Sequence, residues 1–190
     1  MILGFIGTGK IASSVIKGIC KSNINYNKIL ISERNRKISS RLKKDNKKVF
    51  ILKKNQEIVD KSNWVFLSIT PEVGKKIIKK LNFRPEQTII SFISSINLKD
   101  LKNDIRVKAK IVRAIPLPPI SLREGPVPLF PPNKKVKKFF DQLGKSIEIK
   151  NEKLSINFWS TSGMMASYYE ILNVMSTWLI KKGIKRSDAQ

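Results

Sequence analysis

The residues whose types and spacing carry the clearest chemistry are Gly7-x-Gly9-x-x-Ala12, close to the start of the chain. Gly7 permits a tight turn from a strand into a helix, and Gly9 lets the backbone approach a ligand without a Cβ in the way. Ala12 allows the helix to pack closely on the strand. Because the free N–H groups at a helix start bind anions, this spacing predicts a dinucleotide pyrophosphate site. The expected cofactor contacts are Gly7, Thr8, Gly9, Lys10, Ile11 and Ala12.

A second polar segment, Ser32-Glu33-Arg34-Asn35-Arg36, follows the next apolar stretch. In a dinucleotide-binding fold this position distinguishes NAD from NADP, since an acid holds the ribose 2′-OH and basic or hydroxyl groups accept a 2′-phosphate. Glu33 alone favours NAD, whereas Ser32, Arg34 and Asn35 together resemble a phosphate cradle. We predict NADP, with NAD as the alternative, and cofactor contacts from Ser32, Arg34 and Asn35. A solvated charged turn is the alternative for the arginines.

The elements that must position these residues alternate between short apolar strands and amphipathic helices. This pattern predicts an α/β fold of Rossmann type over residues 1–150, with a doubly wound, mainly parallel sheet, followed by a short all-helical segment over residues 151–190. The expected strands are Met1–Ile6, Lys28–Ser32, Val49–Leu52, Trp64–Ile69, Thr88–Ile93, Ala109–Ala114 and Ser146–Ile149. The expected helices follow Gly9, cover Lys37–Asp45 and Asn55–Lys61, and begin at Pro71.

A proline-rich stretch interrupts the alternation between Pro116 and Pro132. Because proline fixes φ and lacks an N–H, this stretch is expected to be extended and irregular, with Val127–Phe130 pairing as an edge strand. A helix is then expected over Lys134–Leu143, with Gly144 as its C-cap.

Composition narrows the classes of function. The net charge is +24, from 38 basic and 14 acidic residues, but the lysines are spread along nearly every segment, so specific nucleic-acid binding is not expected. The chain has no histidine and one cysteine, Cys20, so no metal site and no internal disulfide are expected. Cys20 is predicted to be a small core residue. No membrane span or secretory leader is expected, and the cysteine usage fits a cytoplasmic protein.

With these residues placed, the sequence resembles pyrroline-5-carboxylate reductases along nearly its whole length. The order and spacing of several landmarks together carry the resemblance. They are Gly4-Phe-Ile-Gly-Thr-Gly-Lys-Ile-Ala12, Asn55-Gln-Glu-Ile-Val59, Val65-Phe-Leu-Ser-Ile-Thr-Pro-Glu72, Ile90-Ser-Phe-Ile-Ser-Ser-Ile96, Ile111-Val-Arg-Ala-Ile-Pro116 and Ser160-Thr-Ser-Gly163.

The resemblance implies an NADP-dependent oxidoreductase that transfers a hydride to the C=N bond of pyrroline-5-carboxylate, giving proline. It also implies a helical segment that forms a homodimer and supplies the pocket for the imino-acid substrate. By the same resemblance Asn55 would touch the cofactor ribose. The turn Ser68, Ile69, Thr70 and Pro71 would line the cofactor, and Ala114 and Pro116 would border the nicotinamide.

The sequence also departs from this family. Pro116-Leu-Pro-Pro119 stands where the family has Pro-Asn-Thr-Pro, which removes two polar side chains beside the nicotinamide. The family's distal Ser/Thr- and Gly-rich loop has no counterpart before Gln190, so we expect a shortened helical segment and assign no catalytic residue. The alternative function is a catalytically inactive NAD(P)-binding sensor or scaffold. A β-hydroxyacid dehydrogenase is disfavoured, because Asn173 is preceded one turn earlier by Tyr169 and not by lysine.

The helical tail is rich in large apolar residues, which favours a dimer interface over a helix hairpin packed on its own domain. Ser160, Ser162 and Gly163 are the predicted substrate contacts, because hydroxyls and free N–H groups at a helix start bind carboxylates. The alternative for the same residues is an ordinary N-cap of the long helix.

Overall fold

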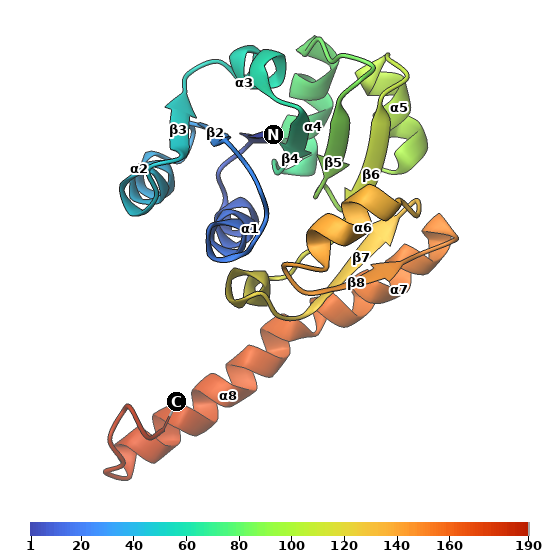
Figure 1. The fold of residues 1–190 in the computed structure, drawn as a ribbon. Coiled ribbons are helices and arrows are strands. Elements are labelled where there is room, and N and C mark those ends of the chain that lie inside the picture. The colour runs from blue at the N-terminus through green and yellow to red at the C-terminus, as the bar shows by residue number, and fades with distance from the viewer. Residues whose placement is uncertain (190) are drawn as a thin grey trace. The chain divides into compact units, whose positions relative to one another are not determined.

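An eight-stranded sheet with helices on both faces makes up the first part of the chain (Figure 1). This computed structural model describes residues 1–189, apart from the side chains of Ile156, Trp159 and Ser162. The strands are β1 (Ile2–Ile6), β2 (Lys28–Ser32), β3 (Val49–Leu52), β4 (Trp64–Leu67), β5 (Thr88–Ser91), β6 (Lys110–Ala114), β7 (Pro126–Phe130) and β8 (Lys145–Glu148).

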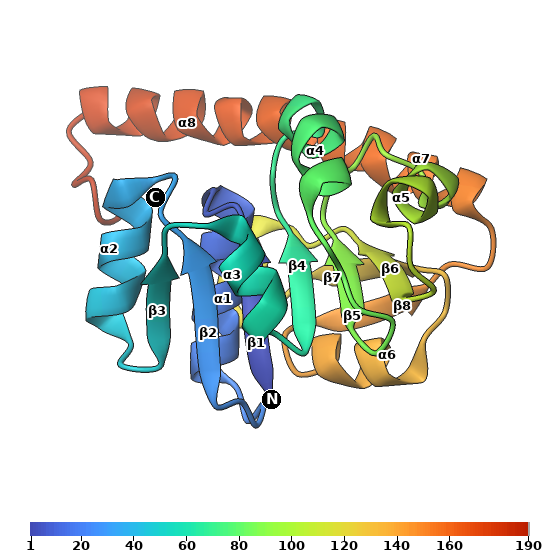
Figure 2. The same cartoon turned by 90° about the horizontal axis from the view of Figure 1, so that it is seen from above.

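The strand order is β3-β2-β1-β4-β5-β6-β7-β8, and all neighbours from β3 to β6 are parallel. β7 runs antiparallel to β6 and parallel to β8. The parallel strands therefore end at one edge of the sheet, where Figure 2 shows their arrowheads. The chain direction along the sheet reverses between β1 and β4, and in such folds ligands bind outside the carboxyl ends of the strands at this point.

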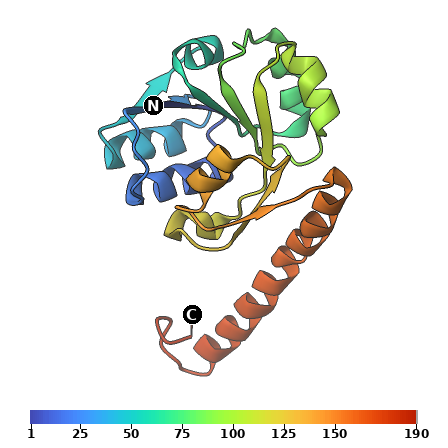
Figure 3. The same ribbon diagram turned by 45° about the vertical axis from the view of Figure 1, so that its right-hand side comes forward.

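Helices cover the two faces of the sheet in two groups (Figures 1 and 3). The first face carries α1 (Lys10–Lys21), α2 (Arg36–Asp45), the 3₁₀ helix η2 (Pro118–Leu122) and α6 (Lys134–Phe140), which share one apolar core. The second face carries α3 (Asn55–Lys61), α4 (Pro71–Ile77), the 3₁₀ helix η1 (Ile78–Lys80) and α5 (Leu98–Ile105), which share another. This is the predicted doubly wound fold.

Aromatic rings in the first core join the central strands to α6. Phe5 of β1 stacks on Phe66 of β4 with ring centroids 4.3 Å apart, and Phe139 of α6 lies 5.8 Å from Phe66 and 5.0 Å from Trp64. Aromatic pairs at such distances add to the stabilisation from apolar burial. They hold β1 and β4 side by side just before both strands reach the carboxyl edge.

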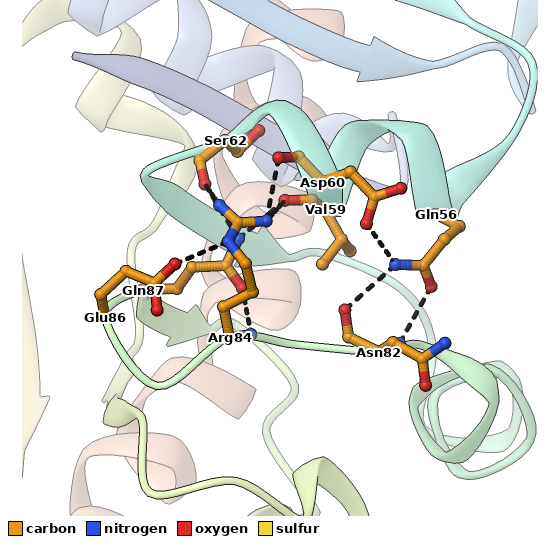
Figure 4. Close-up of polar contacts among 8 residues, drawn as sticks. All are labelled: Gln56, Val59, Asp60, Ser62, Asn82, Arg84, Glu86 and Gln87. Atoms are coloured by element: carbon orange, nitrogen blue, oxygen red, sulfur yellow. Dashed lines mark hydrogen bonds and ion pairs between the residues drawn. The ribbon is translucent and has the colours of Figure 1, made fainter.

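Polar side chains hold the C-terminus of α3 on the other face (Figure 4). The Arg84 guanidinium donates hydrogen bonds to the carbonyl oxygens of Val59, Asp60 and Ser62, at 3.2, 2.9 and 3.1 Å. The buried Gln87 amide donates to the carbonyls of Val59 and Ser62, at 2.7 and 2.9 Å. These bonds satisfy carbonyls that the end of a helix leaves without a helical partner, and so fix the helix that begins at the carboxyl edge.

Most of the predicted boundaries agree with the structure. β2, β3 and α3 have the predicted bounds, and β1, β4, β5 and β6 differ from theirs by one or two residues at one end. β8 begins and ends one residue earlier than predicted.

Three features differ from the sequence predictions. Val127–Phe130 belongs to β7, which is an internal strand and not an edge strand, because β8 pairs along its outer side. Gly144 is not the C-cap of α6, since the helix ends at Phe140. A Cβ on Gly144 would lie 2.5 Å from the carbonyl oxygen of Gly125, so a close backbone approach accounts for this glycine. Helix α5 was not predicted, although Asn97 caps it by accepting from the Asp100 N–H at 2.8 Å.

The chain divides into two compact units, Met1–Glu152 and Lys153–Gln190. The second contains nearly all of α7 (Glu152–Gly163) and the whole of α8 (Met165–Lys181), which follow each other as an extended pair of helices (Figure 3, orange to red). No helix described for residues 1–189 has the length and apolar content needed to cross a membrane. The exposed large apolar side chains of this segment are Leu154, Met164, Tyr168, Tyr169, Ile171, Leu172, Val174, Met175, Trp178, Ile180 and Ile184.

Candidate functional site

The turn from β1 into α1 has the geometry that the glycine spacing predicts. Gly7 adopts φ +96°, and a Cβ there would lie 2.2 Å from the carbonyl oxygen of Ser68, so only glycine fits. Gly9 is the N-cap of α1 and makes no side-chain cap, and a Cβ on Gly9 would meet no atom within 4 Å. The protein itself therefore does not require glycine at position 9. Gly9 keeps open the space in front of the first N–H groups of α1.

Buried hydroxyl groups beneath this turn join it to the end of β2. The Gly7 N–H donates to Ser32 Oγ at 2.9 Å, and Thr8 Oγ1 donates to the Ser32 carbonyl oxygen. The two hydroxyl oxygens lie 3.1 Å apart. Thr8 is 2% exposed and Ser32 is 5% exposed. Ser32 thus contacts the glycine turn from below and does not line the open side of the site.

The segment after β2 brings positive charge to the site. Asn35 caps α2, because its Oδ1 accepts from the Ile38 N–H at 3.2 Å. Arg34 and Arg36 flank it with exposed side chains, and Arg36 Nε lies 3.7 Å from the Glu33 carboxylate. The one acid of this segment is therefore ion-paired, and the segment presents a net positive charge.

The turn after β4 is the third segment of the site, beside the glycine turn and the segment after β2. The Ser68 N–H donates to the Ile6 carbonyl at 2.8 Å, which holds this turn beside the glycine turn. Thr70 is the N-cap of α4, and its carbonyl accepts from the Gly74 N–H at 2.8 Å. Pro71 occupies the first helical position, where its missing N–H costs nothing.

These three segments enclose an open cavity of about 610 Å³ at the point where the strand order reverses. Of the residues described, those lining it include two arginines and no acid. The helix dipole of α1 adds positive potential at the same point. The cavity thus suits a ligand with several negative charges. Its lining is Gly7, Thr8, Gly9, Arg34, Asn35, Arg36, Ser68, Ile69 and Thr70.

The remaining predicted cofactor contacts of this unit lie near the same edge of the sheet. Asn55 begins α3 after β3, and Ala114 ends β6 with the buried Pro116 close behind it. Lys10 is exposed at the first turn of α1, whereas Ala12 is fully buried against the core. Within residues 1–152, none of these five residues is among those lining the cavity.

Arg36 is the lining residue that the predicted contact set omits. Its signal in the sequence is a basic residue directly after the Asn35 cap, which places its side chain on the first turn of α2 beside Arg34. A solvated turn and an anion site have the same composition here, so the sequence alone did not separate them.

A buried arginine fixes the end of β6 before Ala114. Arg113 is 6% exposed, forms an ion pair with Glu152, and donates to the Ser94 carbonyl at 2.6 Å. Glu152 also accepts from the Leu98 N–H at 2.8 Å. Arg113 therefore joins β6, the loop after β5 and the start of α5, and has a structural role.

The single thiol lies away from the cavity. Cys20 is half-buried in the last turns of α1, and its sulfur accepts a hydrogen bond from Tyr26 Oη at 3.6 Å. Burial raises the pKa of the Cys20 thiol, and burial together with the Cys20 contact raises the pKa of Tyr26 to about 12. Neither group has the lowered pKa of a nucleophile or proton donor. The described residues include no group of three or more His, Cys, Asp or Glu side chains able to hold a metal ion.

The predicted substrate contacts belong to the second unit. Ser160 and Gly163 lie in the last turn of α7, and α8 begins after Met164, which makes no side-chain cap. The prediction that they lie at a helix start, with an N-cap as its alternative, is therefore wrong. The helix starts eight residues earlier, at Glu152, because no proline or glycine interrupts the sequence before Gly163. The side chain of Ser162 lies outside the part that the structure describes.

Comparison with known proteins identifies relatives of this chain. Residues 2–95 match the family described as NADP oxidoreductase coenzyme F420-dependent. The pyrroline-5-carboxylate reductase of Pisum sativum is 28% identical over 125 residues, and pyrroline-5-carboxylate reductase 3 of Danio rerio is 29% identical over 126 residues. Each alignment covers 65% of this chain, but only 45% and 43% of those relatives. The chain thus spans less than half the length of the curated relatives it matches.

Solved structures share the fold. The 1-pyrroline-5-carboxylate reductase of Streptococcus pyogenes matches with a TM-score of 0.78 at 23% identity, over 100% of this chain and 73% of that one. The pyrroline carboxylate reductase of Plasmodium falciparum, solved with NADP bound, matches with a TM-score of 0.81 at 21% identity, over 100% of this chain and 72% of that one.

The strand order, the glycine turn and the basic cavity define an NAD(P)-binding fold of Rossmann type. Within that class, the chain is similar in sequence to pyrroline-5-carboxylate reductases, at 28% and 29% identity to the two relatives above, and shares their fold. The resemblance drawn from its sequence landmarks is confirmed.

Proposed function

We propose that this protein is an NADPH-dependent oxidoreductase that reduces the C=N bond of pyrroline-5-carboxylate or a closely similar cyclic imino acid. The observation that carries the proposal is the cavity at the strand-order reversal. There the N-terminus of α1, which no side chain caps, lies close to two arginines. The names of the matched family and relatives supply the reaction class.

Different residues of the chain would hold different parts of the cofactor. The N–H groups of Gly9, Lys10 and Ile11 would hold the pyrophosphate, because no side chain caps α1. Arg34 and Arg36 would hold a 2′-phosphate, which favours NADP over NAD while Glu33 is paired with Arg36.

The nicotinamide would lie toward the turn after β4 and the end of β6, beside Ala114 and Pro116. Asn55 at the start of α3 would lie toward the ribose. Bound NADPH would supply the hydride for the imine carbon, and the nitrogen would take a proton. The protein's part is then to orient the cofactor and neutralise its charge.

The first prediction concerns this activity. The purified full chain should bind NADPH with a change in nicotinamide fluorescence, and should oxidise it when pyrroline-5-carboxylate is added. Titration followed by steady-state absorbance measurement checks both steps. Absence of NADPH binding would contradict the whole proposal. Binding without turnover on pyrroline-5-carboxylate would reject the reaction and favour the alternative of a nucleotide-binding sensor or scaffold.

We also propose that the chain forms a homodimer through α8. Its exposed apolar side chains include Ile171, Val174 and Met175, which are 58%, 59% and 58% exposed and line a shallow apolar groove on that helix. An apolar surface of this kind marks an interface in a protein that stays in solution.

The second prediction follows from the dimer proposal. The wild type should sediment as a dimer at micromolar concentration, and Ile171→Glu should shift it toward monomer, because a buried unpaired carboxylate disfavours the interface. Phe50→Glu is the matched control, since Phe50 is an exposed apolar residue of the first unit, 40% exposed. A monomeric wild type, or equal effects of the two variants, would contradict the proposal.

Three further assignments remain predictions. Ser160, Ser162 and Gly163 are proposed to contact the substrate carboxylate, and no metal takes part in the proposed reaction. A cytoplasmic location is proposed from the cysteine usage, and cell fractionation would test it.

A further inference from the structure

The buried hydroxyl groups of Thr8 and Ser32 form a closed set of hydrogen bonds beneath the glycine turn. Thr8 has one hydroxyl proton, and it donates that proton to the Ser32 carbonyl. Ser32 must therefore be the donor in the 3.1 Å contact between the two hydroxyl oxygens. Ser32 Oγ in turn accepts from the Gly7 N–H at 2.9 Å. Every donor of the set then has one acceptor, and no water is needed to complete it.

This set joins the glycine turn to the end of β2. Gly9 is exposed and has open space where a side chain would be, and its carbonyl accepts from the Ser13 N–H of α1 at 3.0 Å. Thr8, at 2% exposure, is the buried residue between the two glycines. Gly7 adopts a positive φ, but glycine adopts many other conformations just as freely. The hydrogen bond to Ser32 Oγ therefore selects the orientation of the Gly7 N–H.

The neighbouring anion site on α2 is held independently. Asn35 caps α2 because its side-chain Oδ1 accepts from the Ile38 N–H. This hydrogen bond does not involve the glycine turn. Arg34 and Arg36 are exposed and extend from this capped turn. Loss of the Ser32 hydroxyl would therefore leave the arginine side of the cavity in position.

We propose that Thr8 and Ser32 are positioning residues for the pyrophosphate: their buried hydroxyl groups hold the Gly7–Gly9 turn so that the N–H groups of α1 face the ligand. This proposal rests on the proposed function, because it concerns the same cofactor. It assigns Ser32 a role different from the 2′-phosphate contact predicted from the sequence.

The test compares two fragments of the cofactor. ADP-ribose contains the pyrophosphate without a 2′-phosphate, and 2′-AMP contains the 2′-phosphate without a pyrophosphate. Ser32→Ala should raise the Kd for NADPH and for ADP-ribose about tenfold, the scale of one buried hydrogen bond. The Kd for 2′-AMP should change less than about twofold, since its arginine contacts do not depend on Ser32. Calorimetric titration well below the melting temperature measures all three.

Thr8 provides a conservative pair of variants. Thr8→Val keeps the shape and removes the hydroxyl, so it should weaken ADP-ribose binding as Ser32→Ala does. Thr8→Ser keeps the hydroxyl and should retain affinity close to that of the wild type. Ser62→Ala is the matched control, because Ser62 is fully buried, donates to the Ile58 carbonyl and lies at the end of α3 away from the cavity. It should leave all three dissociation constants unchanged.

Two results would overturn the proposal. Equal losses of affinity for ADP-ribose and 2′-AMP would mean that the hydroxyl groups merely stabilise the fold. Unchanged affinity for ADP-ribose would mean that the glycine turn keeps its conformation without these hydroxyl groups. Both results require a wild type that binds NADPH. If the wild type does not bind NADPH, the proposed function itself has failed.

Discussion

Gly9→Asp should abolish NADPH binding while leaving the protein at least as stable as the wild type. Gly9 is the N-cap of α1, with φ −85° and ψ −171°, a conformation that any residue adopts. Aspartate is among the preferred N-cap residues and its charge favours the helix N-terminus, so the free energy of unfolding should rise by about 0.3–1 kcal/mol. The same carboxylate would occupy the position proposed for the pyrophosphate. Repulsion between like charges at about 4 Å should raise the Kd for NADPH about 100-fold or more.

Thermal unfolding and fluorescence titration of the same preparation separate these two effects. Gly9→Ser is the neutral control, because serine also caps a helix but adds no charge. It should raise stability similarly and weaken NADPH binding less than aspartate. A Gly9→Asp protein that binds NADPH as the wild type does would show that the pyrophosphate does not lie at this helix start.

The first unit could be predicted well because its signals are local. Each parallel strand is a short apolar run bounded by polar residues, and burial on both faces demands such runs. Gly7 likewise needs no tertiary information, since the strand–turn–helix junction requires the residue type that the sequence provides. The position of β7 could not be predicted in this way. Prolines indicate an edge strand, and only the pairing of β8 along its outer side makes β7 internal.

The different roles of Ser32 and Arg36 at the cavity could not be predicted from the sequence. Ser32 and Arg36 belong to one short segment, and composition alone suggested the phosphate cradle for Ser32 and left Arg36 out. The structure places the Ser32 hydroxyl under the glycine turn and Arg36 on the cavity wall. Which of the two faces the cavity depends on where β2 ends and α2 begins, and a shift of one residue reverses the direction of a strand side chain.

Replacing both Arg34 and Arg36 with alanine should reverse the preference for the cofactor. The two guanidinium groups are proposed to hold the 2′-phosphate, and hydrogen bonds to charged groups contribute about 1.5–3 kcal/mol each when well formed. Both side chains are exposed, and solvent screening reduces that contribution, so the double variant should raise the Kd for NADPH about 30-fold. The Kd for NADH should fall, because removal of Arg36 frees the Glu33 carboxylate from its 3.7 Å ion pair to accept from a ribose 2′-OH.

The measurement is the ratio of the two dissociation constants, at low and at moderate salt, for the double variant and for Lys37→Ala. Lys37 is the next basic residue of α2, is exposed and does not line the cavity, so it controls for loss of general positive charge. If the arginines acted only through net charge, the affinities for NADPH and NADH would fall together, and added salt would produce the same change in the wild type. A selective loss of NADPH affinity requires direct contact with the 2′-phosphate. That selectivity distinguishes an NADP site on this turn from a generally basic surface on a protein with a net charge of +24.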